Sequence, residues 1–310
     1  VAVVNKLDKE HSNFDAVVRG MNDSLPSCKA VPVQIPIGSE ADFRGVVDLV
    51  TMQAMVGTGP SAKSEAIPSE VAEAAEAAHN ALVEEVASSD ESLMAKYFEN
   101  DPLSADELAS GLRKAIAAGS IVPVLCVSAT GLVGVRSFLD FVGSYVPSPA
   151  DRPAWKGHKP NSDETVEVPP DPSGPLAAVI WKTMRDPFIG RLSLVRVISG
   201  ELRREEQATN PRTGQRERLT GLTFINGRET TDADRVGCGD MACIGKLENS
   251  ITGDTLCDPR APVVFDLPPL PVGMHAASMS AESRADEDKL SGALAQIAEE
   301  DIGFTYERIS

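Results

Sequence analysis

The first half of the chain alternates short apolar runs with segments in which apolar residues recur at helical spacing. The apolar runs lie at residues 1–4, 31–37, 46–56 and 121–127. A continuous run of this kind is typical of a strand that is buried on both faces, as in a parallel sheet. Helical spacing is found at residues 9–25, 68–86, 91–99, 105–117 and 135–142. Residues 1–150 are therefore predicted to form an α/β domain.

The pattern changes in the second half of the chain. Residues 151–174 are rich in Pro, Asp and Ser, which predicts a linker. Short strands punctuated by glycine follow, and over residues 175–267 they are typical of a β-barrel. From residue 268 to 310 we expect a strand at 272–279, a helix at 284–301 and a returning strand at 304–309. That order is half of a split β-α-β module, so a ferredoxin-like α+β domain is predicted to begin here.

Composition narrows the class of protein. A length of 310 residues predicts two or three domains, and the net charge of -17 argues against a simple basic nucleic-acid surface. The five cysteines show no pairing pattern and the four histidines are scattered, so no metal site is predicted. No run has the length of a membrane span and no signal peptide is visible. The chain begins inside a strand without an initiator Met, so we expect a fragment of a longer cytoplasmic protein.

Residues that could bind a ligand follow the first apolar run directly, in the order Asn5-Lys6-Leu7-Asp8. Ligands of open α/β sheets bind at the carboxyl ends of the strands. An ionised Asp8 only accepts hydrogen bonds, so it can accept from both the ring N–H and the exocyclic amine of guanine, a donor pair that adenine lacks. Lys6 can lay its methylene stem along the base, and the Asn5 amide can tie neighbouring loops together. The alternative is a strand end with a polar cap.

A second segment favours guanine over that alternative. The run at 121–127 is followed by Ser128-Ala129-Thr130 and then by a helical pattern. Small residues at such a turn let a backbone N–H approach the base, and the Ala129 N–H is the candidate donor to guanine O6. We therefore predict a GTP site, at its guanine end, formed by Asn5, Lys6, Asp8, Ser128 and Ala129. The long separation of the two segments predicts an inserted α/β subdomain at about residues 30–115.

Two resemblances to phosphate-binding motifs fail on order or spacing. Asp171-Pro-Ser-Gly174 fits Asp-x-x-Gly but follows the base motif instead of preceding it. Gly245-Lys246 resembles the end of a phosphate loop, but Asp240 stands where that loop requires glycine. No catalytic and no metal-binding residue is therefore predicted in this chain.

Several stretches, taken in order, resemble one known family. They are Asn5–Asp8, the segment VPVQIPIGSEADFRGVVD ending at Asp48, Val122–Ala129, Asp186–Leu192, Arg196–Gly200, Thr252–Asp258, Ala285–Leu290 and Ala298–Asp301. This combination covers nearly the whole chain and resembles bacterial elongation factor G, the translocation GTPase of the ribosome. The likeness implies the carboxyl-terminal part of a P-loop GTPase domain with its inserted α/β subdomain, then a β-barrel second domain, then the start of a ferredoxin-like third domain.

The resemblance also implies ligands and partners. GTP and GDP are the expected ligands, and the expected partner is the ribosome, with its acidic large-subunit stalk protein meeting the inserted subdomain. The phosphate loop, both switch loops and the Mg²⁺ ligands of the family precede the position of Asn5, so Mg²⁺ is expected to bind only through residues outside this chain. The parent protein would be a GTP hydrolase, whereas this chain alone is predicted neither to bind GTP tightly nor to hydrolyse it. A monomer without membrane association is expected.

Three positions depart from the family pattern. The family usually has Met where Leu7 stands, Arg where Lys9 stands, and often Gly where Val127 stands. These departures are typical of a divergent paralogue, and other roles stay open: ribosome recycling, support of peptide release, ribosomal protection, or a non-hydrolysing ribosome-binding module with a vestigial base pocket.

Overall fold

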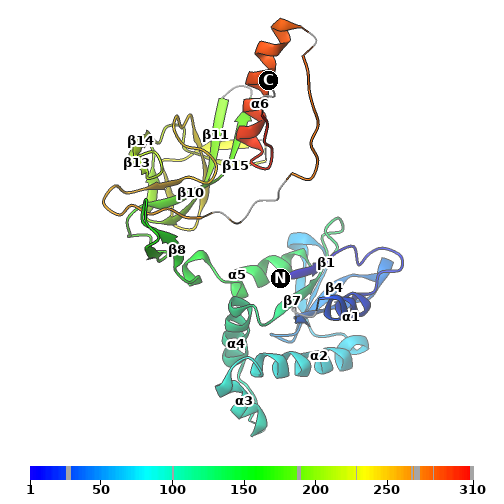
Figure 1. The fold of residues 1–310 in the computed structure, drawn as a ribbon. Coiled ribbons are helices and arrows are strands. Elements are labelled where there is room, and N and C mark those ends of the chain that lie inside the picture. Colours follow the sequence, from blue (N-terminus) through cyan, green and yellow to red (C-terminus); the bar gives the residue numbers. More distant parts are fainter. Residues whose placement is uncertain are drawn as a thin grey trace. The chain divides into compact units, whose positions relative to one another are not determined.

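A computed structural model of the protein describes residues 1–25, 29–99, 101–186, 190–227, 229–266, 268, 273–281 and 283–307, apart from the side chains of residues 285 and 288. The chain forms two compact units, Val1–Ser148 and Pro149–Ser310 (Figure 1). Each has hydrophobic clusters of its own. None of the described helices is long and apolar enough to cross a membrane.

The first unit contains a three-stranded parallel sheet in the order β1-β7-β2. Its strands are β1 (Ala2–Val4), β7 (Val122–Cys126) and β2 (Ala30–Pro32). The apolar run at 31–37 proves to be two strands, because β2 stays in this sheet and β3 (Gln34–Ile37) enters another. The fully buried Val33 lies between them: its N–H donates to Val124 O at 3.1 Å and its carbonyl accepts from Leu49 N at 3.0 Å. One residue thus joins the two sheets.

A second, antiparallel sheet of the first unit has the order β3-β4-β5-β6. The run at 46–56 is a hairpin of β4 (Gly45–Asp48) and β5 (Gln53–Val56), and β6 (Lys63–Glu65) follows a short 3-10 turn, η2 (Gly59–Ser61). Asp48 makes the hairpin turn, since its Oδ1 accepts from the backbone N–H groups of Val50 and Thr51 at 2.9 Å each. An earlier 3-10 turn, η1 (Glu40–Asp42), connects β3 to β4.

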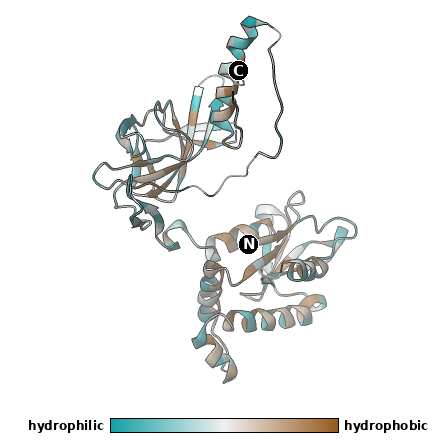
Figure 2. Cartoon of the chain, viewed as in Figure 1, coloured by the Kyte–Doolittle hydropathy of each residue, from teal (hydrophilic) through white to brown (hydrophobic). Residues whose placement is uncertain are grey.

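The described residues of the first unit also form five α-helices, close to the predicted positions. They are α1 (Phe14–Ser24), α2 (Ser69–Ala87), α3 (Glu91–Phe98), α4 (Ala105–Ala118) and α5 (Val135–Tyr145). Local signals set their ends: Asn13 caps α1, Ser104 and Glu107 form a capping box on α4, and the left-handed Gly119 ends α4. Hydrophobic and hydrophilic residues alternate along these helices, as Figure 2 shows.

The apolar spacing in residues 9–25 places Phe14, Val17, Val18 and Met21 on one face of the helix, and the structure buries only part of that face. Phe14 is buried, and Val18 and Met21 pack against the same cluster, but Val17 is 43% exposed.

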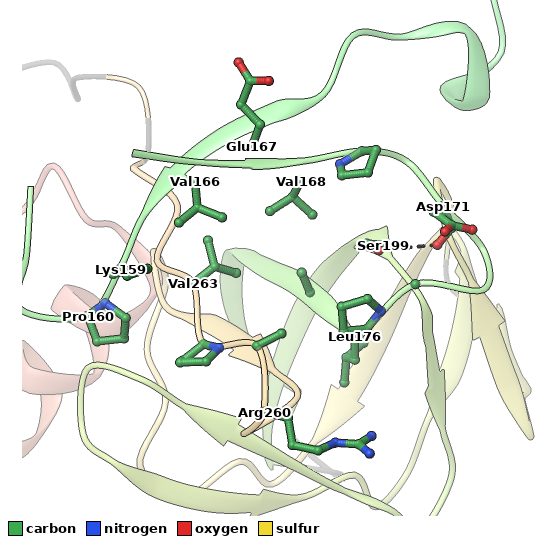
Figure 3. A pocket seen from close by; sticks show the side chains of 16 residues that line it. Lys159, Pro160, Val166, Glu167, Val168, Asp171, Leu176, Ser199, Arg260 and Val263 are labelled. Carbon is green, nitrogen blue, oxygen red and sulfur yellow. Dashed lines mark hydrogen bonds between the residues drawn. The ribbon is translucent and has the colours of Figure 1, made fainter. Parts of the chain in front are cut away.

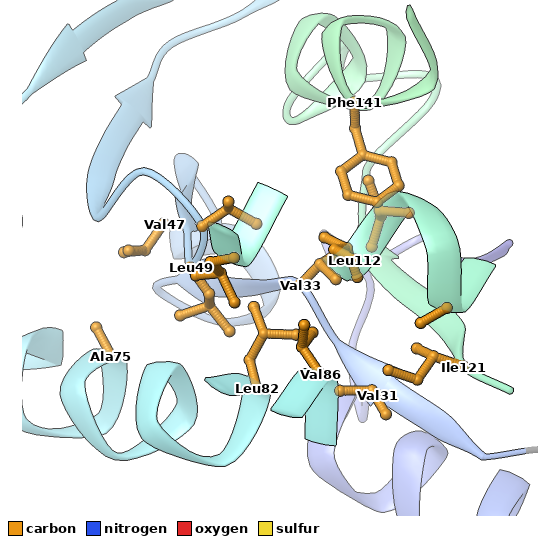
Figure 4. Packing of buried hydrophobic residues seen from close by; sticks show 14 of the residues in the cluster. Val31, Val33, Val47, Leu49, Ala75, Leu82, Val86, Leu112, Ile121 and Phe141 are labelled. Carbon is orange, nitrogen blue, oxygen red and sulfur yellow. The ribbon is translucent and has the colours of Figure 1, made fainter. Parts of the chain in front are cut away.

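The largest cluster of the first unit lies between α2, α4 and the β2–β3–β4 region (Figure 4). A second cluster joins the residues around β1 to the antiparallel sheet, since Val4, Leu7 and Cys126 pack with Phe43 and Val46. The region at 30–115 therefore shares a core with the two segments that carry the predicted base motif.

The second unit is a barrel-like antiparallel domain built on an eight-stranded sheet in the order β14-β13-β19-β10-β11-β18-β15-β16. Its long central strands are β10 (Ala177–Asp186) and β11 (Gly190–Ser199). The others are β13 (Gln207–Asn210), β14 (Gln215–Arg218), β15 (Thr223–Asn226), β16 (Glu229–Asp232), β18 (Met241–Gly245) and β19 (Thr255–Cys257). A separate pair, β12 (Glu201–Arg203) and β17 (Arg235–Gly237), adds to it. The β-barrel expectation is confirmed.

Residues 151–174, whose composition predicts a linker, contain a hairpin. After the 3-10 turn η3 (Pro149–Asp151), β8 (Trp155–His158) pairs with β9 (Thr165–Val168). The hairpin is fastened to the barrel because His158 and Val264 exchange backbone hydrogen bonds of 2.9 Å and Trp155 packs edge-on against Phe265. These partners lie about a hundred residues away in sequence, so local composition could not reveal them.

The end of the chain differs from the ferredoxin-like expectation. Helix α6 (Arg284–Glu300) forms as predicted, capped by Ser283. Residues 273–279 and 304–307 form no strand, and residues 272, 308 and 309 of the two predicted strands lie outside the described residues. A strand needs a neighbour to complete its hydrogen-bond ladder, and no described segment pairs with either stretch.

Candidate functional site

The two predicted base-binding segments leave the sheet at the same edge. Strands β1 and β7 are adjacent and parallel, with Val4 opposite Cys126. Asn5–Asp8 follows β1 and Val127–Ala129 follows β7. The pairing continues past the strands, because Val127 N donates to Val4 O at 3.0 Å and Leu7 N donates to Val127 O at 3.4 Å. The structure thus brings together two loops that are far apart in sequence.

Asn5 links these loops through its side chain. Its Oδ1 accepts from Lys6 N at 2.7 Å and from Ala129 N at 3.0 Å. The Ala129 N–H, which the sequence assigns to guanine O6, therefore already has a partner. A bound base would have to share this N–H with Asn5 or displace the Asn5 oxygen.

Asp8 presents a carboxylate next to this link. Its Oδ2 lies 2.8 Å from Lys9 Nζ, while Oδ1 is buried and has no hydrogen bond of ordinary geometry among the described residues. Lys9 first, and then the Ser128 hydroxyl, lower the pKa of Asp8 below its ordinary value. Asp8 is consequently ionised at neutral pH and can only accept hydrogen bonds. As an ionised carboxylate, Asp8 is suited to accept N–H donors of a ligand in addition to its contacts with Lys9 and Ser128.

Lys6 and Ser128 occupy opposite environments. Lys6 is exposed and has a left-handed backbone with φ of 64°, an uncommon conformation outside glycine. Leu7 beside it is buried, so this turn directs one residue into the core and its neighbour outward. Ser128 is fully buried, and its Oγ accepts from Gly131 N at 3.1 Å. The five residues predicted as a site therefore lie on two adjoining loops.

Sequence reasoning missed several residues that shape this edge. Lys9 stands out in the sequence only as a departure from a family pattern, yet it is the ion-pair partner of Asp8. Gly59 and Leu132, which hold the turn after β7 through a 2.8 Å backbone hydrogen bond, carry no local signal, because their partnership depends on folding. A Lys next to an Asp is common on surfaces and does not by itself mark a site.

The residues fit one end of a guanine nucleotide better than the other. The ionised Asp8 carboxylate suits the two N–H groups of guanine, whereas the Ala129 N–H is bonded to Asn5 Oδ1 and would have to be shared with the base. For the phosphates and Mg²⁺, the described residues contain no group of three or more His, Cys, Asp or Glu side chains arranged to hold a metal. The sequence has no glycine-rich loop ending in Gly-Lys-Ser or Gly-Lys-Thr.

A separate cavity of about 580 Å³ lies in the second unit, between the β8–β9 hairpin and the barrel (Figure 3). Its walls are mainly valine, proline and alanine, with Lys159, Glu167 and Arg260 among the lining residues. The Ser199 hydroxyl is already used, since it donates to Asp171 O at 3.3 Å. The lining is thus mainly apolar and presents few groups that could form directed hydrogen bonds with a ligand.

Comparison with known proteins agrees with this architecture. Residues 175–259 match the family model of elongation factor G domain 2. A crystal structure of a protein from Thermus thermophilus matches with a TM-score of 0.82 and 23% sequence identity, covering 99% of this chain and 43% of that one. At that identity the likeness shows the fold alone, and this chain spans less than half of the Thermus chain. Residues 175–259 thus match elongation factor G domain 2, and the chain as a whole shares its fold with the Thermus protein.

Proposed function

We propose that this chain belongs to a ribosome-associated translational GTPase of the elongation factor G type and contributes guanine recognition to it. The observation that carries the proposal is the Asn5–Ala129 hydrogen bond beside the ionised Asp8, at the edge where β1 and β7 end. The match of residues 175–259 to elongation factor G domain 2 supports the translational assignment. Translocation is the proposed role, and recycling, release support or ribosomal protection are the alternatives.

In this proposal the carboxylate of Asp8 selects the base. It accepts the N1–H and the exocyclic N2–H of guanine, whereas adenine would place its N1 lone pair against the carboxylate. A mismatch that leaves buried polar groups unpaired in this way should favour guanine over adenine by roughly four powers of ten. The Asn5–Ala129 hydrogen bond holds the two loops together, the Ser128 hydroxyl supports the carboxylate, and the Lys6 stem would cover the base.

The rest of the proposal follows the family. The parent protein would hydrolyse GTP in the cytoplasm as a monomer, would bind the ribosome, and would meet the large-subunit stalk protein through residues 30–115. Phosphate and Mg²⁺ binding would come from residues other than those of this chain.

Exchanging Asp8 for Asn tests the base assignment in the full-length protein. Asp8→Asn places an amide donor opposite the exocyclic amine of guanine, so GDP affinity should fall about 100-fold and XDP, which has a carbonyl there, should become the better ligand. Asp15→Asn, an exposed carboxylate in the first turn of α1, is the matched control and should change neither affinity. Unchanged selectivity in Asp8→Asn would favour the vestigial pocket.

A hydrolysis assay of the 310-residue chain tests whether phosphate and Mg²⁺ binding come from residues outside this chain. With the phosphate contacts and metal ligands of phosphoryl transfer absent from its sequence, the chain should release phosphate from GTP no faster than buffer does. Turnover above that background, removed by Asp8→Asn, would contradict the proposal.

A further inference from the structure

The turn that follows β7 carries the Ala129 N–H of the proposed base site, and it is closed by its own hydrogen bonds. Ser128 N donates to Val133 O at 2.9 Å, Val133 N donates to Ser128 O at 3.2 Å, and Gly131 N donates to Ser128 Oγ at 3.1 Å. A small displacement of residues 128–133 would therefore move Ala129 as part of a rigid loop.

A loop of the 30–115 region holds the outer side of this turn. Residues 57–62, between β5 and β6, form an antiparallel bridge between Thr58 and Val133, and Gly59 N donates to Leu132 O at 2.8 Å. Arg136, in the first turn of α5, adds a third tie because its Nη1 donates to Ala62 O at 3.2 Å. Backbone and side-chain bonds thus fasten the 57–62 loop to both ends of the segment 132–136.

The backbone at this contact is held in an uncommon conformation. Leu132 has a φ of 57° although it is not glycine, and Gly59 opposite has a φ of 52°. A left-handed conformation is unfavourable for a non-glycine residue and persists only where its surroundings hold it. The hydrogen bond from Gly59 to the Leu132 carbonyl is such a restraint.

The 57–62 loop is in turn fixed to the inserted region behind it. Gly57 N donates to Arg44 O at 2.9 Å, and the Arg44 side chain is paired with Glu70 in the first turn of α2. A continuous set of contacts therefore runs from the start of α2 to the turn that carries Ala129.

We propose that the 57–62 loop positions the base-recognition turn, so that the inserted region sets how tightly guanine is bound. Arg136, Gly59 and Thr58 act as positioning residues, because none of them lies on the loops assigned to the base. This inference rests on the proposed guanine site. The turn would contact O6 if the Ala129 N–H shares or exchanges its bond to Asn5 Oδ1. We infer that this contact can be changed from the inserted region, while selection of the exocyclic amine stays with Asp8.

The test uses Arg136→Ala in the full-length protein, with Arg136→Lys as the conservative variant that keeps one donor for Ala62 O. Arg113→Ala is the matched control, since Arg113 Nε makes a similar bond to a backbone carbonyl, Ser144 O at 2.8 Å, at the other end of α5. Affinities for GDP and IDP are measured, because inosine keeps O6 but lacks the exocyclic amine. Hydrogen exchange of the 128–133 amides is followed in parallel in the 310-residue chain.

Arg136→Ala should weaken GDP and IDP equally, by about threefold to tenfold, should speed exchange at 128–133, and should keep the GDP-to-IDP ratio. Arg136→Lys should recover part of the affinity, and Arg113→Ala should match the wild type. Unchanged affinity in Arg136→Ala, or equal losses in Arg113→Ala, would overturn the inference. If Asp8→Asn still switches the preference to xanthine in that case, the guanine site stands and only the positioning role fails.

Discussion

Asp254 illustrates, at the scale of single residues, how a buried charge is held in the second unit. Its side chain is 4% exposed and accepts from Arg212 Nη2 at 2.7 Å, Asn210 Nδ2 at 2.8 Å and Ile251 N at 2.9 Å. Burial alone would raise the pKa of Asp254, but the hydrogen bonds from Arg212, Ile251 and Asn210 outweigh it, so the pKa is lowered. The carboxylate thereby organises the loop between β18 and β19.

Replacing this carboxylate should be costly. Asp254→Asn removes the charge and sets an amide against existing donors, so the free energy of unfolding should fall by about 2 kcal/mol in urea titrations. Asp258→Asn is the control, because its partner Arg260 is 89% exposed and exposed pairs contribute under about 1 kcal/mol. Because the folded pKa of Asp254 lies below 3.8, its stabilisation is present above that pH and is lost as pH falls through the folded pKa. An equal fall in the free energy of unfolding in Asp254→Asn and Asp258→Asn would contradict a special stabilising role for the buried Asp254 carboxylate.

At the scale of elements, two helical glycines differ in what surrounds them. A Cβ at Gly111 in α4 would lie 2.6 Å from Leu93 Cδ1 and 2.7 Å from Val86 Cγ1, whereas a Cβ at Gly143 in α5 would meet no atom within 4 Å. Gly111 therefore permits close packing of α4 on α2 and α3. Gly143 has no such role and only lowers helix propensity.

Alanine at the two positions should act in opposite directions. Gly143→Ala should stabilise the protein by about 0.5–1 kcal/mol through helix propensity. Gly111→Ala should destabilise it by about 1–3 kcal/mol, because the new methyl overpacks the helix contact. Thermal and urea unfolding measure both, and a gain of stability in Gly111→Ala would show that the helices can separate without cost.

The β8–β9 hairpin contains a pH-sensitive contact. His158 Nδ1 donates to Lys159 O at 3.0 Å, and its Nε2 lies 3.5 Å from Asp266 Oδ1. The bond to the Lys159 carbonyl, followed by the charge of Asp266, raises the pKa of His158 above 6.5. The imidazolium thus fastens the hairpin to the segment after β19.

Because the folded pKa is raised, this stabilisation is complete below pH 6.5 and is lost as pH rises through the folded value. Hydrogen exchange at Val264, corrected for the intrinsic rate, should therefore show weaker protection at about pH 8 than at about pH 6. Asp266→Asn should reduce this dependence. Equal protection at both pH values in the unmodified chain would contradict a stabilising role for the contact between protonated His158 and Asp266.

At the scale of the whole molecule, the division at Ser148 and Pro149 separates two sets of cores. A chain of residues 149–310 should therefore unfold cooperatively, and its transition should coincide with one of two transitions of the whole chain in calorimetry. Including the β8–β9 hairpin matters, because its strands cover the cluster around Ala177 and Phe265. A non-cooperative transition in the 149–310 chain would show that the barrel depends on the first unit.

Much of the local structure follows from the sequence alone. The five helices of the first unit, and α6, are set by apolar spacing and by caps that reach only three or four residues, such as Ser104 with Glu107. The buried strands β1 and β7, and the Asn-Lys-x-Asp order at a strand end, are likewise local patterns. The chemistry proposed for Asp8 needs only the identity of that residue and its place after a strand.

Tertiary structure decided the rest, because the deciding bonds join residues far apart in the chain. The link from Ala129 to Asn5 spans 124 residues, and it uses the N–H that the sequence assigns to a base. Pairing with Val264 turned an apparent linker into the β8–β9 hairpin, whereas the lack of a described partner left residues 273–279 without a strand. Spacing predicts which face of a segment is buried, but a ladder forms only where folding supplies a second backbone.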